Sequence, residues 1–232
     1  MLRKTSGIVL STLKYKESSI ISRIYTRELG TKSYIINSVR SAKSKNKAAL
    51  YRPMSILDLL VYERSNANIN RISEAKFHPS SFIVLPNISK TSILLFLSEV
   101  LNKALIHEEE QDYQLFDFIN RSLIYFSKAE ANIENFHLIF LIQLTNYLGF
   151  DFEGNTALMA VKNNLKITEK DIPSTQELQL LNALRICNFN EQFSLNSNSR
   201  NSLLRFVLQY YSTFISSLDK INSLDVLSEV FK

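Results

Sequence analysis

Basic residues gather in the first part of this chain in a pattern that could bind a polyanion. The tightest group, with no acidic residue inside it, is Arg40, Lys43, Lys45 and Lys47. Lysine and arginine side chains that neutralise phosphates release condensed counterions, which drives nucleic-acid binding. On charge and proximity alone, Arg27 and Lys32 are further candidates for contact with a nucleic acid. The same kind of run is also typical of a solvated basic loop.

Aromatic residues accompany this charge. The tyrosines of the same segment include Tyr15, Tyr25, Tyr34 and Tyr51. Aromatic faces accept unstacked bases with little regard to sequence, so tyrosines beside lysines and arginines favour single-strand binding. A tyrosine in such a segment can equally belong to a hydrophobic core, and its type alone does not decide between these roles.

Residues for covalent chemistry are sparse. The three histidines, His78, His107 and His137, show no metal-ligand or nucleophile spacing, and His137 lies in an apolar run that predicts a core position. Cys187 is the single cysteine and is read as a small buried hydrophobe, so neither an internal disulfide nor a cysteine-rich zinc site is possible. Four glycines in the whole chain leave no glycine-rich phosphate loop. We therefore expect no enzyme activity, no metal and no cofactor. Carboxylates that are distant in the sequence can still come together in the fold without leaving a sequence motif.

The charge divides between two parts of the chain. Residues 1–80 hold 15 Lys and Arg against 5 Asp and Glu, whereas residues 81–232 hold 12 against 17. The asymmetry favours two domains within the 232 residues. The scarcity of cysteine favours a reducing, cytoplasmic compartment, and no run is long and apolar enough to predict a membrane span.

Residues 1–80 carry the pattern of a small β domain. Short runs rich in Ile, Val, Thr and Tyr predict five strands at 7–13, 19–26, 31–39, 55–62 and 70–77. The first two are expected to pair as a hairpin through residues 14–18. Five short strands without a long helix suggest an OB-fold barrel, a surface that commonly binds single strands.

Beyond a junction rich in proline, serine and asparagine at 78–92, the apolar period becomes helical. Helices are predicted at 91–106, 113–126, 134–148, 174–187, 198–218 and 224–231. Ser174 and Glu177 have the spacing of a capping box. Residues 151–170 lack a clear period, and a small hairpin of 157–161 with 165–167 is the expectation there. The fold class is thus α+β and multidomain: a five-stranded OB-fold barrel over 1–80, then an all-α domain over 81–232.

These residues resemble a known family, the bacterial recombination mediator RecO. The amino-terminal similarity lies in Gly7-Ile8-Val9-Leu10, Tyr15-Lys16-Glu17-Ser18, Thr26 with Gly30, the basic segment 38–45, and Pro53-Met54-Ser55-Ile56-Leu57. Near the end, the closing helices of the family are matched by Leu203-Leu204, Tyr210-Tyr211 and 223–227. The fragments occur in order along nearly the whole chain.

The resemblance implies a DNA repair and recombination mediator. Members bind single- and double-stranded DNA and anneal complementary strands. With RecR, they help RecA to replace single-stranded DNA-binding protein. The helical domain of the family binds the acidic carboxyl-terminal tail of that protein. It implies action at the nucleoid in the cytoplasm, and it places Arg40, Lys43 and Lys45 in the basic segment of the family. Many members carry a four-cysteine zinc site after the segment matching 144–150, which this sequence lacks.

Three other kinds of protein remain open at this point, of which an unrecognised enzyme is opposed only by the lack of a catalytic constellation. An OB-fold module that binds RNA would prefer structured RNA to single-stranded DNA. A protein adaptor would use the basic loop to meet an acidic partner surface, and charge reversal at Arg40, Lys43 and Lys45 would then abolish the complex while sparing DNA binding.

Overall fold

The structure is a computed structural model of the chain. It describes residues 1–37, 39, 45–63, 67–79, 87–131, 133–163, 172–191 and 193–231. Their contacts divide the chain into two compact units, one of residues 1–85 with 94–127 and the other of residues 86–93 with 128–232. The domain boundary between residues 80 and 81 stays a prediction.

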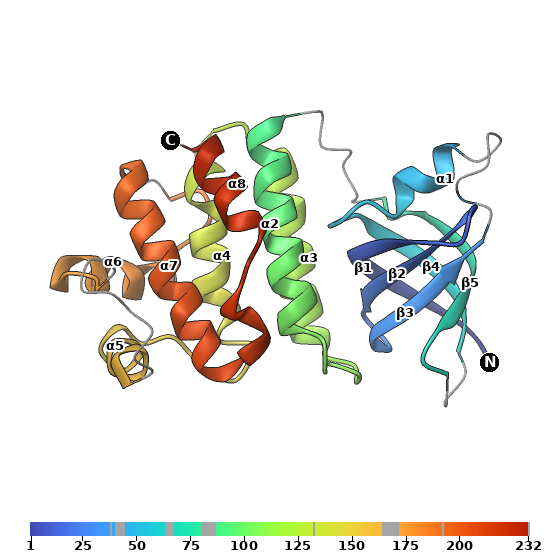
Figure 1. The fold of residues 1–232 in the computed structure, drawn as a ribbon, viewed down its shortest axis with the longest axis horizontal. Helices are drawn as coiled ribbons and strands as arrows, with labels where there is room; N and C mark the ends of the chain where they lie inside the picture. The colour runs from blue at the N-terminus through green and yellow to red at the C-terminus, as the bar shows by residue number, and fades with distance from the viewer. Residues whose placement is uncertain are drawn as a thin grey trace. The chain divides into compact units, whose positions relative to one another are not determined.

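The predicted five strands close into a barrel (Figure 1), and their order around it is β1-β2-β3-β5-β4. The strands are β1 (Leu2–Tyr15), β2 (Ser19–Thr26), β3 (Gly30–Ile36), β4 (Ile56–Tyr62) and β5 (Asn70–Phe77). Neighbours are antiparallel except β3 and β5, which pair in parallel at Tyr34 with Asn70 and Ile35 with Arg71. This closing pair completes a five-stranded barrel of the OB type.

Strand β1 is longer than the predicted run because it serves two partners. Its first half pairs with β4 and its second half with β2, with a register shift between Val9 and Ser11. At Gly7, where both pairings overlap, an added Cβ would lie 2.6 Å from Ile24 Cγ2 and 2.9 Å from Leu59 Cδ1. Glycine therefore lets the strand approach the barrel core at the point where it changes partner.

The barrel core follows the predicted alternation. Leu57, Leu59 and Val61 are buried while Tyr62 is exposed, as period-two patterning requires. A short helix that the sequence reading missed, α1 (Lys45–Leu50), lies between β3 and β4 at one end of the barrel (Figure 1). Tyr51, directly after α1, is buried in the same core.

Most of the predicted helices are confirmed, with shifted ends. The structure has α2 (Ile88–Ala104), α3 (Tyr113–Lys128), a 3-10 turn η2 (Ile133–Asn135), α4 (Phe136–Leu144), α5 (Gly154–Asn163), α6 (Thr175–Leu184), α7 (Ser197–Phe214), a 3-10 turn η4 (Ser216–Asp219) and α8 (Ser223–Val230). The capping box before α6 is present, since Ser174 Oγ accepts from the Glu177 backbone N–H and the Glu177 carboxylate accepts from the Ser174 N–H. His137 is buried in α4, as predicted. Cys187 is only partly buried.

The predicted hairpin near residue 160 is wrong in its first arm. Residues 157–161 lie inside α5, where Ala157 and Val161 are buried at a spacing of four. That spacing places both on one face of a helix, which decides the period in favour of helix over strand. The second arm, 165–167, lies outside the described residues. Among the helices that the structure describes, none is long and apolar enough to cross a membrane.

Candidate nucleic-acid interface

The β1–β2 hairpin carries an exposed cationic tip. Strand β1 ends in Leu13, Lys14 and Tyr15, all exposed, and Lys16 opens the turn to β2. Lys16 has a φ of 53°, in the left-handed region. Its Nζ lies 5.4 Å from the centroid of the Tyr15 ring, within the range of a cation–π contact. The tip therefore combines an aromatic ring with positive charge.

Two hydrogen bonds fix the chain on either side of the basic segment to this hairpin. The Val39 N–H donates to the Ser18 carbonyl at 2.9 Å, just before the segment. Just after it, Thr12 Oγ1 donates to the Tyr51 carbonyl at 2.9 Å. The backbone that enters and leaves the predicted DNA-binding cluster is thus held against one end of the barrel.

Part of the predicted basic cluster, Arg40 to Lys47, lies outside the described residues. Arg40 and Lys43 lie outside the described residues, and so does the side chain of Lys45, although its backbone begins α1. Lys47 is exposed on α1, and Arg52 is exposed shortly after this helix. Among the described residues, the side chains of Lys14, Lys16, Lys47 and Arg52 form no ion pair, so their charge remains available to a ligand.

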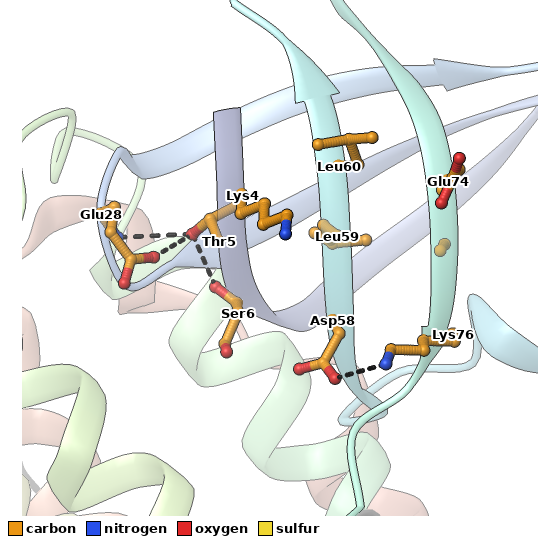
Figure 2. A pocket seen from close by; sticks show the side chains of 10 residues that line it. Lys4, Thr5, Ser6, Glu28, Asp58, Leu59, Leu60, Glu74 and Lys76 are labelled. Carbon is orange, nitrogen blue, oxygen red and sulfur yellow. Dashed lines mark hydrogen bonds and ion pairs between the residues drawn. The ribbon is translucent and has the colours of Figure 1, made fainter. Parts of the chain in front are cut away.

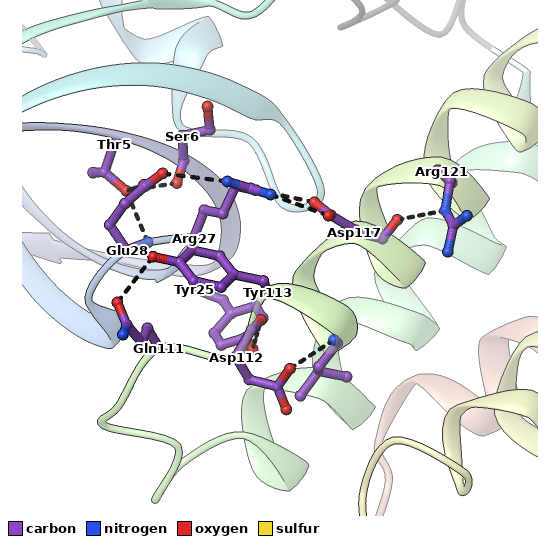
Figure 3. Close-up of polar contacts among 11 residues, drawn as sticks. Thr5, Ser6, Tyr25, Arg27, Glu28, Gln111, Asp112, Tyr113, Asp117 and Arg121 are labelled. Atoms are coloured by element: carbon purple, nitrogen blue, oxygen red, sulfur yellow. Dashed lines mark hydrogen bonds and ion pairs between the residues drawn. The ribbon is translucent and has the colours of Figure 1, made fainter.

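Arg27 lies at the other end of β2 and binds protein. Its Nε and Nη2 donate to the two carboxylate oxygens of Asp117 on α3 at 3.0 and 3.1 Å (Figure 3). Its guanidinium also lies 4.7 Å from the ring centroid of Tyr113. The bidentate bond lowers the pKa of the Asp117 carboxyl and raises that of Arg27. Arg27 therefore ties the barrel to α3 within the same compact unit.

Lys32 is engaged beside this contact. Its Nζ donates to the Glu109 carbonyl at 3.1 Å, and the neighbouring Thr31 N–H donates to the Glu108 carbonyl at 2.6 Å. The acidic segment before α3 thus meets the start of β3 through its backbone. The structure brings Arg27 and Lys32 together at this end of β2 and β3 and places Lys47 at the opposite end. Their contact with DNA stays a prediction.

The four tyrosines fall into two classes. Tyr25, Tyr34 and Tyr51 are buried, and burial raises the pKa of all three hydroxyls, that of Tyr51 to about 12. Tyr15 is 38% exposed. Among these four, Tyr15 is the ring that can meet an unstacked base.

A groove of about 520 Å³ crosses β1, β4 and β5 on the barrel wall (Figure 2). Three carboxylates line it, those of Glu28, Asp58 and Glu74, against the two lysines Lys4 and Lys76. Asp58 pairs with Lys76 at 3.6 Å. This balance of charge suits a polyanion less well than the hairpin and α1 do.

Sequence reading missed Lys14 and Lys16 as candidates for DNA contact. Both lie in the connector of the predicted hairpin, where two lysines on either side of a tyrosine are the signal that indicates them. Among the described residues, no three side chains of His, Cys, Asp or Glu are grouped so that they could hold a metal ion.

An OB-type barrel with a cationic end, followed by a helical region, defines a class of nucleic-acid-binding proteins. Comparison with known proteins narrows the class. Residues 1–80 match the family described as Recombination protein O N terminal, and residues 85–156 match Recombination protein O C terminal. The chain belongs to the RecO family of DNA repair proteins.

Relatives match along the whole chain. The DNA repair protein RecO of Phocaeicola vulgatus is 33% identical over 243 residues, covering 100% of both chains. That of Flavobacterium psychrophilum is 32% identical over 240 residues, covering 98% of each, and that of Bacteroides fragilis is 32% identical over 246 residues, covering 100% of each. The family resemblance seen in the sequence is thereby confirmed.

Proposed function

We propose that this chain binds single- and double-stranded DNA through its barrel and anneals complementary strands. With RecR, it would help to load RecA onto DNA coated with single-stranded DNA-binding protein, whose acidic tail the helical region would take. The proposal needs no covalent catalysis by this chain, and it places the protein at the nucleoid in the cytoplasm.

The observation that carries this proposal is the set of cations without ion pairs at the hairpin and α1. Elsewhere on the barrel, several cations are engaged by acids, as Arg3 is by Glu63 at 3.0 Å and Arg27 by Asp117. Charges without such partners can follow a phosphate backbone and leave the bases free to meet a complementary strand. Annealing requires that combination.

Salt dependence gives the first test. The four cations at the hairpin and around α1 are Lys14, Lys16, Lys47 and Arg52. If each neutralises one phosphate, log K should fall with log salt at a slope of about −3 on single strands. Affinity would then drop roughly 50-fold between 50 and 200 mM salt, and more steeply with further contacts. Binding that ignores salt over this range would contradict the phosphate-based mechanism.

A matched pair of variants locates the binding site. Lys47→Glu on α1 and Lys162→Glu on α5 each change one exposed helical lysine and shift the net charge equally. We expect Lys47→Glu to weaken DNA binding and flatten the salt slope, and Lys162→Glu to leave both unchanged. Equal losses in the two variants would indicate a response to net charge rather than a site.

Annealing on coated DNA tests the mediator activity. Complementary strands covered with single-stranded DNA-binding protein should anneal in the presence of this chain, and a coat without its carboxyl-terminal tails should reduce the rate. The absence of annealing with either coat would count against the function. A preference for structured RNA in competition would favour an RNA-binding module instead, and loss of a protein complex alone on charge reversal would favour an adaptor.

A further inference from the structure

The turn of the β1–β2 hairpin holds one residue in a costly conformation. Lys16 has a φ of 53°, and a left-handed backbone costs a residue with a Cβ on the order of 1 kcal/mol. Glycine or asparagine would adopt this conformation more readily. Strained residues of this kind concentrate at ligand sites, so the turn invites a functional explanation.

The left-handed backbone at Lys16 brings its side chain back to the ring of Tyr15. Successive residues of a strand point to opposite faces, so Leu13 and Tyr15 share one face of β1 and Lys14 points to the other. The backbone at Lys16 then reverses, and its ammonium lies over the Tyr15 ring at 5.4 Å. Leu13, 69% exposed, and Tyr15, 38% exposed, therefore lie on one face of the strand, and the Lys16 ammonium lies against the Tyr15 ring.

From this arrangement we infer that the hairpin tip is a stacking site for an unpaired base of single-stranded DNA. The base takes the place of the Lys16 ammonium over the Tyr15 ring, flanked by Leu13, and the displaced Lys16 side chain meets the adjacent phosphate. This inference rests on the proposed function and adds a residue that distinguishes single strands from duplex. Phosphate contacts serve both kinds of DNA, whereas a base inside a duplex is already paired and stacked.

The surroundings favour a nucleic acid over a protein segment as the occupant. The backbone on both sides of the basic segment is fixed to this hairpin at Ser18 and Thr12, and Lys47 and Arg52, which flank the bonded Tyr51, are exposed. Glu17 is the one acidic residue of the turn. Positive charge around an aromatic ring is the combination that single-strand sites share.

Four forms of the full chain test the inference. Tyr15→Leu removes the ring, Tyr15→Phe keeps it, and Tyr62→Leu removes another exposed tyrosine of the barrel, 49% exposed at the far end of β4. Each is measured by fluorescence anisotropy against oligo-dT and against a duplex of equal length, after circular dichroism confirms folding. Stacking on one tyrosine typically contributes about fivefold or more to affinity.

We expect Tyr15→Leu to weaken oligo-dT binding at least about fivefold, with duplex affinity and the salt slope within about twofold of the parent protein. Tyr15→Phe and Tyr62→Leu should bind both ligands as the parent does. A parent protein that binds neither DNA would overturn the proposed function itself. A parent that binds both, with Tyr15→Leu unchanged, would overturn this inference alone.

Three further outcomes would also overturn the stacking site. Equal losses on oligo-dT and duplex in Tyr15→Leu would indicate a structural role for the ring in holding the hairpin. Equal losses in Tyr15→Leu and Tyr62→Leu would indicate a general surface effect. Intact DNA binding with loss of RecR binding in Tyr15→Leu would make the tip a protein-docking site.

Discussion

Replacing Gly30 with alanine should break the contact between the barrel and the segment before α3. Gly30 begins β3 with a φ of +64°, which L side chains rarely adopt. An added Cβ would lie 2.5 Å from the carbonyl oxygens of Glu108 and Glu110, and 2.6 Å from the carbonyl carbon of Glu109. These are backbone atoms, so no side-chain rotation can relieve the overlap.

The size of the effect follows from two separate costs. The left-handed backbone costs alanine about 1 kcal/mol. The overlap must then move the acidic segment by about 0.9 Å to restore ordinary contact at 3.4 Å. Such a shift disrupts the hydrogen bond from the Thr31 N–H to the Glu108 carbonyl, worth about 1 kcal/mol, and loosens the packing around it. The total is roughly 2–4 kcal/mol of lost stability.

Gly149 provides a matched control. Its φ is +80°, but an added Cβ would meet nothing within 4 Å, so Gly149→Ala carries the backbone cost alone, about 1 kcal/mol. Urea unfolding gives the free energies, and hydrogen exchange at the Thr31 amide reports the contact directly. If Gly30→Ala loses no more stability than Gly149→Ala and Thr31 stays protected, the overlap with the acidic segment does not matter and the reasoning fails.

Three smaller perturbations test other parts of the chain. Asp117→Asn should cost less than about 1 kcal/mol because both side chains of its pair with Arg27 are more than a third exposed. The Arg27 hydrogen bond lowers the folded-state pKa of Asp117, so the difference in melting temperature should be present above about pH 4 and disappear as pH falls further. Burial lowers the pKa of His137 to about 3, so the unfolded chain takes up its proton first, and stability should fall from about pH 6.5 downward by at most ~1.4 kcal/mol per pH unit. The urea midpoint of His137→Leu should not fall with pH in this way. An unchanged fall in the variant would show that His137 is not its cause. Ser174→Ala should cost about 1 kcal/mol by uncapping α6, with faster amide exchange there and little change in Thr175→Ala.

The sequence predicts the barrel well because strand signals are local. Runs of β-branched and aromatic residues marked all five strands, and the buried faces of β4 followed the alternation of Leu57, Leu59 and Val61. The parallel pairing of β3 with β5 joins segments more than 30 residues apart, and no local pattern encodes it. Helix α1 was missed because six residues beside a charge run carry too little period to detect.

The sequence predicted a basic barrel domain as the candidate site, but not which of its residues and turns form that site. Composition indicated a basic barrel, but the left-handed turn at Lys16 depends on how two strands meet, which residue types do not reveal. The bond between Arg27 and Asp117 joins residues 90 positions apart. A lysine or arginine in a basic segment has the same sequence signature whether it binds a ligand or another part of the chain.

This ambiguity bears on how net charge predicts binding. The +10 of residues 1–80 counts every cation equally, yet the Arg27 guanidinium is already neutralised by a bidentate carboxylate and Arg3 by Glu63. A cation held this way would have to lose its partner before it could bind a phosphate, and that loss offsets part of the gain. The charge available to DNA is therefore that of the cations without ion pairs, and among the described residues Lys14, Lys16, Lys47 and Arg52 are four such cations at the hairpin and around α1. A barrel of the same composition and net charge, in which acidic side chains paired with these three lysines and one arginine, would lack the site.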